Sequence, residues 1–369
     1  MSNEKRLPDG DGILPVQDIA SLIETRVVKL EAEPAPRQLQ PASLDLRLGR
    51  IAYRVRASFL PGPGCLVSDR LEPLSLHRLD LTDGAVLETG CVYIVPLLEA
   101  LELPADVSAA TNPKSSTGRL DVFTRVIADG VTAFDQIPSG YAGPLYAEIC
   151  PQTFPILVRT GSTLSQIRFR RGDPREPDTA LQILQDGSGL VSGGTVDIAA
   201  GIALSVDLAP SADGSLIGYR ARRHTGIIDV DQPASCTIAD YWEEIRAVGN
   251  NRRLILDPDQ FYILASKEAV SIPPTHAAEL MPFNPLVGEF RVHYAGFMDP
   301  GFGDPSTGGG GARVVLEVRS HSVPFVLEDG QIIGRLIYER MRDVPTTLYG
   351  SDLKSNYQAQ GLKLSKHFR

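Results

Sequence analysis

Two stretches of the chain carry one pattern of residues. Residues 144–167 read "PLYAEICPQTFPILVRTGSTLSQI", and residues 313–336 read "RVVLEVRSHSVPFVLEDGQIIGRL". Glu148 aligns with Glu317, a Pro and a Gly recur at matching positions, and the apolar positions agree. Because self-similarity at a fixed spacing is the signature of a repeated structural unit, we expect the same acid-bearing strand twice.

Further segments align at nearly the same spacing. "LETGCVYIV" (87–95) matches "LDPDQFYIL" (256–264), and "IAYRVRA" (51–57) matches "IGYRARR" (217–223). The apolar residues come in short runs bounded by Pro and Gly, which is typical of short strands in a sandwich or barrel. The sequence therefore predicts a mostly β fold with two tandem domains, and 369 residues suffice for both.

The start of the chain and its middle show other patterns. "VQDIASLIETRV" (16–27) has apolar residues at helical spacing, which predicts a short N-terminal helix. Charge, Pro and Gly accumulate in residues 172–194, between two strand-rich stretches. We therefore predict a first domain over residues 1–185 and a second over residues 186–369.

Composition limits the classes of partner. A net charge of -9 gives no reason to expect a nucleic acid polymer, although a small phosphorylated ligand stays open. No apolar run approaches the roughly 18 residues that a membrane span needs, and the N-terminus lacks a secretory apolar region, so we expect a cytoplasmic protein. The four cysteines form no C-x-x-C pair, and H-x-E with P-C-x-x-C is absent, so zinc-dependent base deamination finds no support.

The stretch "NPKSSTGRL" (112–120) concentrates cations and hydroxyls. A triphosphate is bound by charge-assisted donors and close backbone approach, which this loop is able to supply. A plain polar turn is the alternative, and the loop lacks the Walker spacing. The candidate phosphate ligands are Lys114, Ser115, Ser116 and Arg119.

Two acidic residues of the second half are candidate site residues. Asp299 stands in a D-P-G turn, where it either caps its own backbone or serves a ligand. Glu317 is flanked by apolar residues and shares a strand face with Val315. A buried carboxylate is paired, neutral or functional, and burial raises its pKa toward the range useful for proton transfer. An exposed strand glutamate is the alternative, and the same argument applies to Glu148.

Taken together, these segments resemble the dCTP deaminase branch of the trimeric dUTPase-like family. "ILPVQDIASLIETRVVKLE" is similar to its opening helix, "QPASLDLRLG" (40–49) to its signature strand, and "KSSTGRL" to its phosphate motif, with Lys114 where Arg is usual. "AGFMDPGFG", "VVLEV" and "YGSDLKSNYQAQG" are similar to its base-and-sugar hairpin, its catalytic strand and its C-terminal lid.

The resemblance implies hydrolytic deamination of dCTP to dUTP and ammonia, without zinc and with Mg²⁺ bound through the triphosphate. Glu317 would be the general base that activates water, and the backbone of Ala295 would help hold that water. Val315 would face the base, and Asp299 would accept from the sugar 3′-hydroxyl. The phosphates would be held by Lys114, Ser115, Ser116 and Arg119, and the lid would contribute Tyr349 and Gln360.

Each half departs from the family pattern in its own way. The first half has Pro138 where the hairpin Asp belongs, and the second has "MPFNPLVGE" where the phosphate motif belongs. We therefore expect one composite site from unlike halves, with Glu148 a relic or a structural residue. Asn356 stands where the family lid often has Lys, so Lys354 or another cation is expected to substitute.

Assembly and activity leave alternatives open. Family sites form across interfaces, so we expect a homo-oligomer, with a trimer as the candidate. A ring of three domains cannot alternate two kinds of half, so either the ring is not simple or like halves segregate. The rival functions are a bifunctional deaminase that continues to dUMP, a dUTPase, and a non-catalytic nucleotide-binding regulator.

Overall fold

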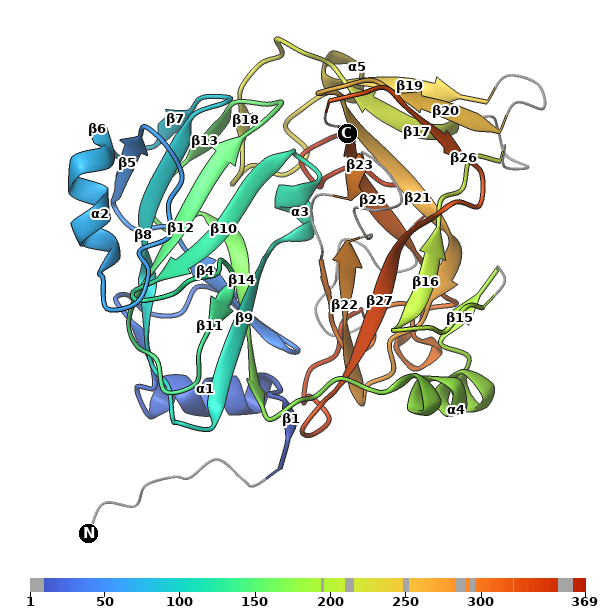
Figure 1. Cartoon of the computed structure of the whole chain (residues 1–369), viewed down its shortest axis with the longest axis horizontal. Helices are drawn as coiled ribbons and strands as arrows, with labels where there is room; N and C mark the ends of the chain where they lie inside the picture. The colour runs from blue at the N-terminus through green and yellow to red at the C-terminus, as the bar shows by residue number, and fades with distance from the viewer. Residues whose placement is uncertain are drawn as a thin grey trace.

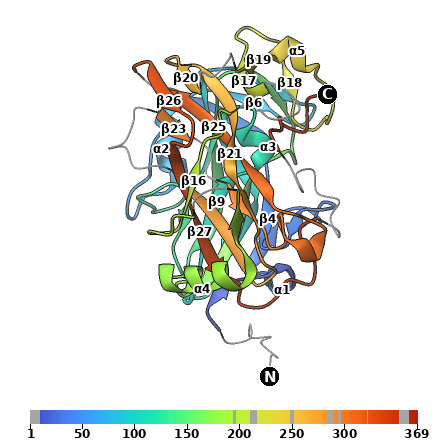
Figure 2. The ribbon, with the colours of Figure 1, turned by 90° about the vertical axis from the view of Figure 1, so that its right-hand side faces the viewer.

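The computed structural model describes residues 10–193, 196–209, 216–247, 252–282, 290–292, 296–320, 322–350 and 361–369. The chain forms two β-rich halves that lie side by side, the first on the left of Figure 1 and the second on the right. Figures 1 and 2 both place α1 (Val16–Glu24) and α4 (Asp178–Ser188) at one end of the molecule, and the C-terminus toward the other.

The first half contains β1 (Gly12–Ile13), β2 (Val28–Leu30), β3 (Leu39–Gln40), β4 (Ser43–Arg47), β5 (Ile51–Val55), α2 (Val67–Leu74), β6 (Ser75–Asp80), β7 (Ala85–Leu87), β8 (Val92–Glu102), β9 (Val107–Pro113), α3 (Ser115–Gly118), β10 (Val122–Ala128), β11 (Gln136–Ile137), β12 (Ala142–Pro151), β13 (Ile156–Val158) and β14 (Thr163–Arg171). After α4 the second half contains β15 (Val191–Ser192), β16 (Ile202–Ser205), β17 (Leu216–Ala221), β18 (Ile228–Asp229), α5 (Ile238–Tyr241), β19 (Trp242–Arg246), β20 (Arg253–Leu256), β21 (Phe261–Val270), β22 (His276–Pro282), β23 (Phe290–Val292), β24 (Phe297–Met298), η2 (Pro305–Thr307), β25 (Ala312–Ser320), β26 (Phe325–Glu328) and β27 (Ile332–Arg340).

The two halves repeat one topology. The strand order β12-β8-β5-β6 in the first half corresponds to β25-β21-β17-β19 in the second, and β9-β14-β4 corresponds to β22-β27-β16. The register agrees residue for residue, since Glu148 pairs with Ile94 and Glu317 pairs with Ile263. The predicted mostly β fold with tandem domains and a short N-terminal helix is therefore confirmed.

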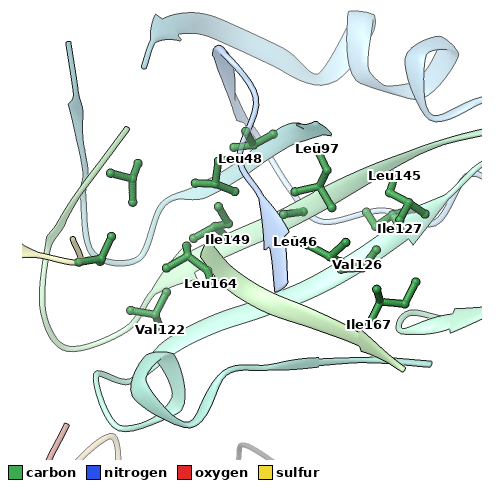
Figure 3. Packing of buried hydrophobic residues seen from close by; sticks show 14 of the residues in the cluster. Leu46, Leu48, Leu97, Val122, Val126, Ile127, Leu145, Ile149, Leu164 and Ile167 are labelled. Carbon is green, nitrogen blue, oxygen red and sulfur yellow. The ribbon is translucent and has the colours of Figure 1, made fainter. Parts of the chain in front are cut away.

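Each half buries its core between facing sheets. In the first half Leu46, Val126, Ile149 and Ile167 point into one interior from four different strands, as Figure 3 shows. Strand residues alternate between the two faces, so the inward positions of both sheets supply this core.

The two halves are also interlocked. β18 of the second half pairs in parallel with β13 of the first. The ring of Phe154 packs edge-on against Trp242 with centroids 5.5 Å apart, and Phe368 near the C-terminus packs on Trp242 at 5.7 Å. Because buried aromatic side chains contribute much of the apolar area in a core, this cluster fixes the C-terminal segment against both halves.

The region between the halves differs from a plain linker. The predicted division at residue 185 falls inside α4, which starts after Pro177 and is followed by Gly189 in a left-handed conformation. Asp178 in its first turn accepts hydrogen bonds from the backbone of Ala200 and Gly201 at 2.7 and 2.9 Å. The flanking Pro and Gly residues thus mark the ends of a helix. Across the described ranges, no helix has both the length and the apolar content to cross a membrane.

Candidate active site

A cavity of about 480 Å³ lies between the two halves. Both halves contribute predicted site residues to its lining: Lys114, Ser115, Ser116, Arg119, Asp299, Val315, Glu317 and Tyr349. The other two predicted residues, Ala295 and Gln360, lie outside the described residues. Unlike halves therefore meet within a single chain, and α3 with its phosphate-type loop faces the second half (Figure 1).

Lys114 enters the cavity from the end of β9. Its ammonium forms an ion pair with Asp45 of β4 and donates a hydrogen bond to Thr163 Oγ1 at 2.9 Å. Burial raises the pKa of the Asp45 carboxyl, and the neighbouring Lys114 charge opposes that rise. The lysine is thus held in place by a buried carboxylate, with its charge at the cavity wall.

Glu317 lies on β25 and is only 4% exposed. Its closest cation is Arg119 from the first half, whose Nε lies 3.8 Å from Glu317 Oε1. Burial raises the pKa of Glu317 to about 7, and the Arg119 charge partly opposes this rise. A carboxylate with a pKa near neutrality is able both to accept a proton and to return it.

Asp299 lies next to β24, at the start of the D-P-G turn, and is 8% exposed. Arg168 reaches it from β14 of the first half, with Nη2 3.5 Å from Asp299 Oδ1. Arg168 also donates to Met298 O at 3.3 Å and to Glu339 Oε2 at 3.1 Å. Burial raises the pKa of Asp299 to about 6 against the opposing Arg168 charge. The acid is thus both buried and held by a cation of the other half.

Tyr349 packs on the same turn. Its backbone N–H donates to Pro300 O at 2.9 Å, and its ring meets Phe302 edge-on with centroids 5.5 Å apart. Gly301 has φ +95, and a Cβ there would lie 2.8 Å from Tyr349 O. Only a glycine allows this close approach, so the turn and Tyr349 form one wall of the cavity.

Glu148, the counterpart of Glu317, is arranged differently. It lies on β12, where Arg125 of its own half donates to Oε1 at 2.6 and 3.1 Å. The Arg125 guanidinium in turn stacks over Phe134 at 3.4 Å from the ring centroid. Glu148 does not line the cavity. It is held instead in a close ion pair with Arg125 within the first half.

Sequence reasoning missed Asp45 and Lys366, which line the cavity, and Arg168, which contacts Asp299. Asp45 had a signal, because a charged residue alternates there with apolar ones in "SLDLRL", as Glu317 does in its strand. Arg168 and Lys366 had none, since their neighbours come from distant parts of the chain. Within the ranges that the structure covers, no group of three or more His, Cys, Asp or Glu side chains is arranged for a metal ion.

The duplicated β fold and the shared cavity define the class. A cationic, hydroxyl-bearing loop from one half faces buried carboxylates from the other, which is the layout of a two-domain enzyme acting on a phosphorylated small molecule. The chain matches the N-terminal domain model of 2′-deoxycytidine 5′-triphosphate deaminase over residues 10–173 and the C-terminal domain model over residues 177–368. It belongs to the 2′-deoxycytidine 5′-triphosphate deaminase family.

Known proteins agree with this placement. The crystal structure of 2′-deoxycytidine 5′-triphosphate deaminase from Agrobacterium tumefaciens superposes with a TM-score of 0.86 at 57% identity, covering 91% of this chain and 100% of that one. A dCTP deaminase of Shewanella amazonensis is 26% identical over 42% of this chain and 80% of its own length. A dUMP-forming dCTP deaminase of Methanoculleus marisnigri is 32% identical over 37% of this chain and 70% of its own. Both of these relatives are about as long as one half of this chain.

Proposed function

We propose that this chain hydrolyses dCTP to dUTP and ammonia, with Glu317 as the general base and without a zinc ion. The observation that carries the proposal is the burial of Glu317, with a pKa of about 7, in a cavity that the cationic loop of the other half also lines. Family membership supports the substrate and the overall reaction.

The residues of the cavity have different proposed roles in the reaction. Glu317 takes a proton from water, the water oxygen attacks C4 of cytosine, and the proton passes to the amino group, which leaves as ammonia. The proposed sugar contact is Asp299, which accepts from the 3′-hydroxyl, while Val315 faces the base. The proposed phosphate ligands are Lys114, Ser115, Ser116 and Arg119, and Mg²⁺ arrives as part of the substrate.

The contacts of the cavity acids support a reaction in which one carboxylate acts as general base without a metal ion. Asp45 faces Lys114, Asp299 faces Arg168, and Glu317 faces Arg119. Each of these three acids thus lies near a cation, and Arg168 also pairs with Glu339. The contact at Glu317 is the longest of the three, at 3.8 Å, and the Glu317 side chain lines the cavity. The roles of Ala295 and Gln360 stay predictions.

A matched pair of variants tests the assignment. Glu317→Gln keeps the shape but cannot accept a proton, so ammonia release from dCTP should be abolished. Glu148→Gln alters the equivalent position in the other half, whose carboxylate lies outside the cavity, and should keep most of the turnover. Ammonia release and nucleotide products are measured with and without Mg²⁺. Loss of turnover in Glu148→Gln with activity kept in Glu317→Gln would reverse the assignment.

A second candidate is a bifunctional enzyme that continues from dUTP to dUMP. The relative from Methanoculleus marisnigri is a dUMP-forming dCTP deaminase, which supports this second candidate. Chromatographic separation of dUTP, dUMP and pyrophosphate after incubation with dCTP distinguishes the two. The proposed reaction leaves dUTP as the final nucleotide, whereas equal amounts of dUMP and pyrophosphate would favour the bifunctional reaction. Binding of dCTP without ammonia would instead indicate a regulator.

A further inference from the structure

The C-terminal segment, residues 361–369, brings one more cation to the cavity. Lys366 lines the same cavity as Lys114 and Glu317. Its side chain is partly buried, whereas Lys363 on the same segment is exposed and does not belong to the lining. The two lysines therefore differ in where they place their charges, although both stand near the end of the chain.

The residues next to Lys366 fix its position. On one side Ser365 Oγ donates to Ser116 O at 2.8 Å, which ties the segment to the phosphate-type loop. On the other side His367 Nε2 lies 2.9 Å from Val230 O. Ser365 and His367 are each 2% exposed. A lysine between two anchored, buried residues is preorganised, which reduces the entropy cost of binding a ligand.

The charges around Lys366 are suited to an anion. Burial raises the pKa of the Asp45 carboxyl, and the charges of Lys114 and Lys366 both oppose that rise. Burial, followed by repulsion from Lys114, lowers the pKa of the Lys366 ammonium. Two ammonium groups are thus close enough to interact around one buried carboxylate. A polyanion placed between them would offset the repulsion between the two ammonium groups.

We propose that Lys366 binds the triphosphate of the nucleotide together with Lys114. Asn356 stands where the family lid often has Lys, so another cation is expected to substitute. Lys366 would be that cation. An ammonium offers three donors, and its hydrogen bonds to phosphate oxygens are charge-assisted. The inference rests on the proposed function, since it takes the cavity to hold a nucleoside triphosphate.

The test compares two lysines of one segment. Lys366→Met keeps the length of the side chain and removes the charge, and Lys363→Met makes the same change outside the cavity. Calorimetry measures the binding of inorganic tripolyphosphate and of deoxycytidine to the full chain, and of dCTP in a Glu317→Gln background. Lys366→Met should weaken the binding of tripolyphosphate and of dCTP by about ten- to a hundredfold and leave the binding of deoxycytidine unchanged. Lys363→Met should bind all three as before, and Lys366→Arg should keep most of the affinity.

Other outcomes overturn the inference. Unchanged tripolyphosphate binding in Lys366→Met, or equal weakening in Lys363→Met, would remove Lys366 from the phosphate site. An equal loss of deoxycytidine binding would show that the effect is not specific to phosphate and would likewise remove Lys366 from the phosphate site. Should the methionine variant not fold, Lys366→Gln is measured in the same way. A wild-type chain that binds tripolyphosphate through Lys366 but releases no ammonia from dCTP would refute the deaminase proposal alone.

Discussion

At the scale of single residues, Glu148 and Glu317 have equivalent strand positions and different neighbours. Glu148 is held at 2.6 Å by Arg125 of its own half. Glu317 lies 3.8 Å from Arg119 of the other half and borders the cavity. Burial raises the pKa of Glu317 to about 7, and the Arg119 charge partly opposes this rise. Such a carboxylate suits proton transfer near neutral pH.

The raised pKa of Glu317 predicts the pH dependence of the reaction. Because burial raises that pKa to about 7, the protonated form persists to higher pH than in an exposed glutamate. The protonated form cannot accept a proton from water, so kcat/KM should fall by about tenfold for each pH unit below 7. A profile of kcat/KM against pH with dCTP measures this limb directly.

A further profile checks the origin of the acid limb. Glu148→Gln should leave the acid limb where it is, because its carboxylate lies outside the cavity. If the acid limb shifted in Glu148→Gln, or if kcat/KM stayed constant down to pH 5, another group would limit the rate.

At the scale of elements, β14 carries three arginines, and two of them, Arg168 and Arg170, contact different halves. The partners of Arg168 all lie in the second half and include Ala278 O at 3.2 Å and Glu339 at 3.1 Å. Arg170, two positions along the same strand, bonds to Ser108 and Gln136 of its own half. Arg168 therefore joins the halves at the proposed sugar site, whereas the hydrogen bonds of Arg170 lie within the sheet of the first half.

This difference predicts unequal effects on stability. Arg168→Gln leaves buried acids without their cation, and we expect it to lower the free energy of unfolding by about 3 to 5 kcal/mol. It should also raise the KM for dCTP, because Asp299 loses the cation that holds it. Arg170→Gln should cost about 1 kcal/mol or less, since its partners are partly exposed. Urea unfolding and steady-state kinetics measure both; equal effects of the two variants would contradict the account.

The sequence predicts strands better than it predicts their partners. The strands that carry Glu148 and Glu317 and the helix α1 follow from apolar spacing and from the repeat. The pairing of β18 with β13 does not, because a contact between residues 156 and 228 leaves no local pattern. Arg168 and Lys366 were missed for the same reason. A side chain's face follows from alternation, but its partner depends on the packing of distant segments.

At the scale of the whole molecule, duplication allows the two halves to divide one site. The first half keeps the phosphate-type loop and the second keeps Asp299 and Glu317, and both line one cavity within the chain. The halves are joined by the pairing of β18 with β13 and by the aromatic cluster around Trp242. Unlike halves thus meet without an alternating ring of chains. The homo-oligomer, and a trimer in particular, stays a prediction.

A complementation experiment tests the central claim that one chain forms one composite site. Arg119→Glu disables the first-half wall and Glu317→Gln disables the second-half wall, so each variant alone should be inactive toward dCTP. The two variants are then co-expressed with different affinity tags and purified through both tags. If each site lies within a chain, the mixed sample should release no more ammonia than the single variants. Recovery of substantial activity in the mixed sample would show that the walls come from different chains and would contradict the account.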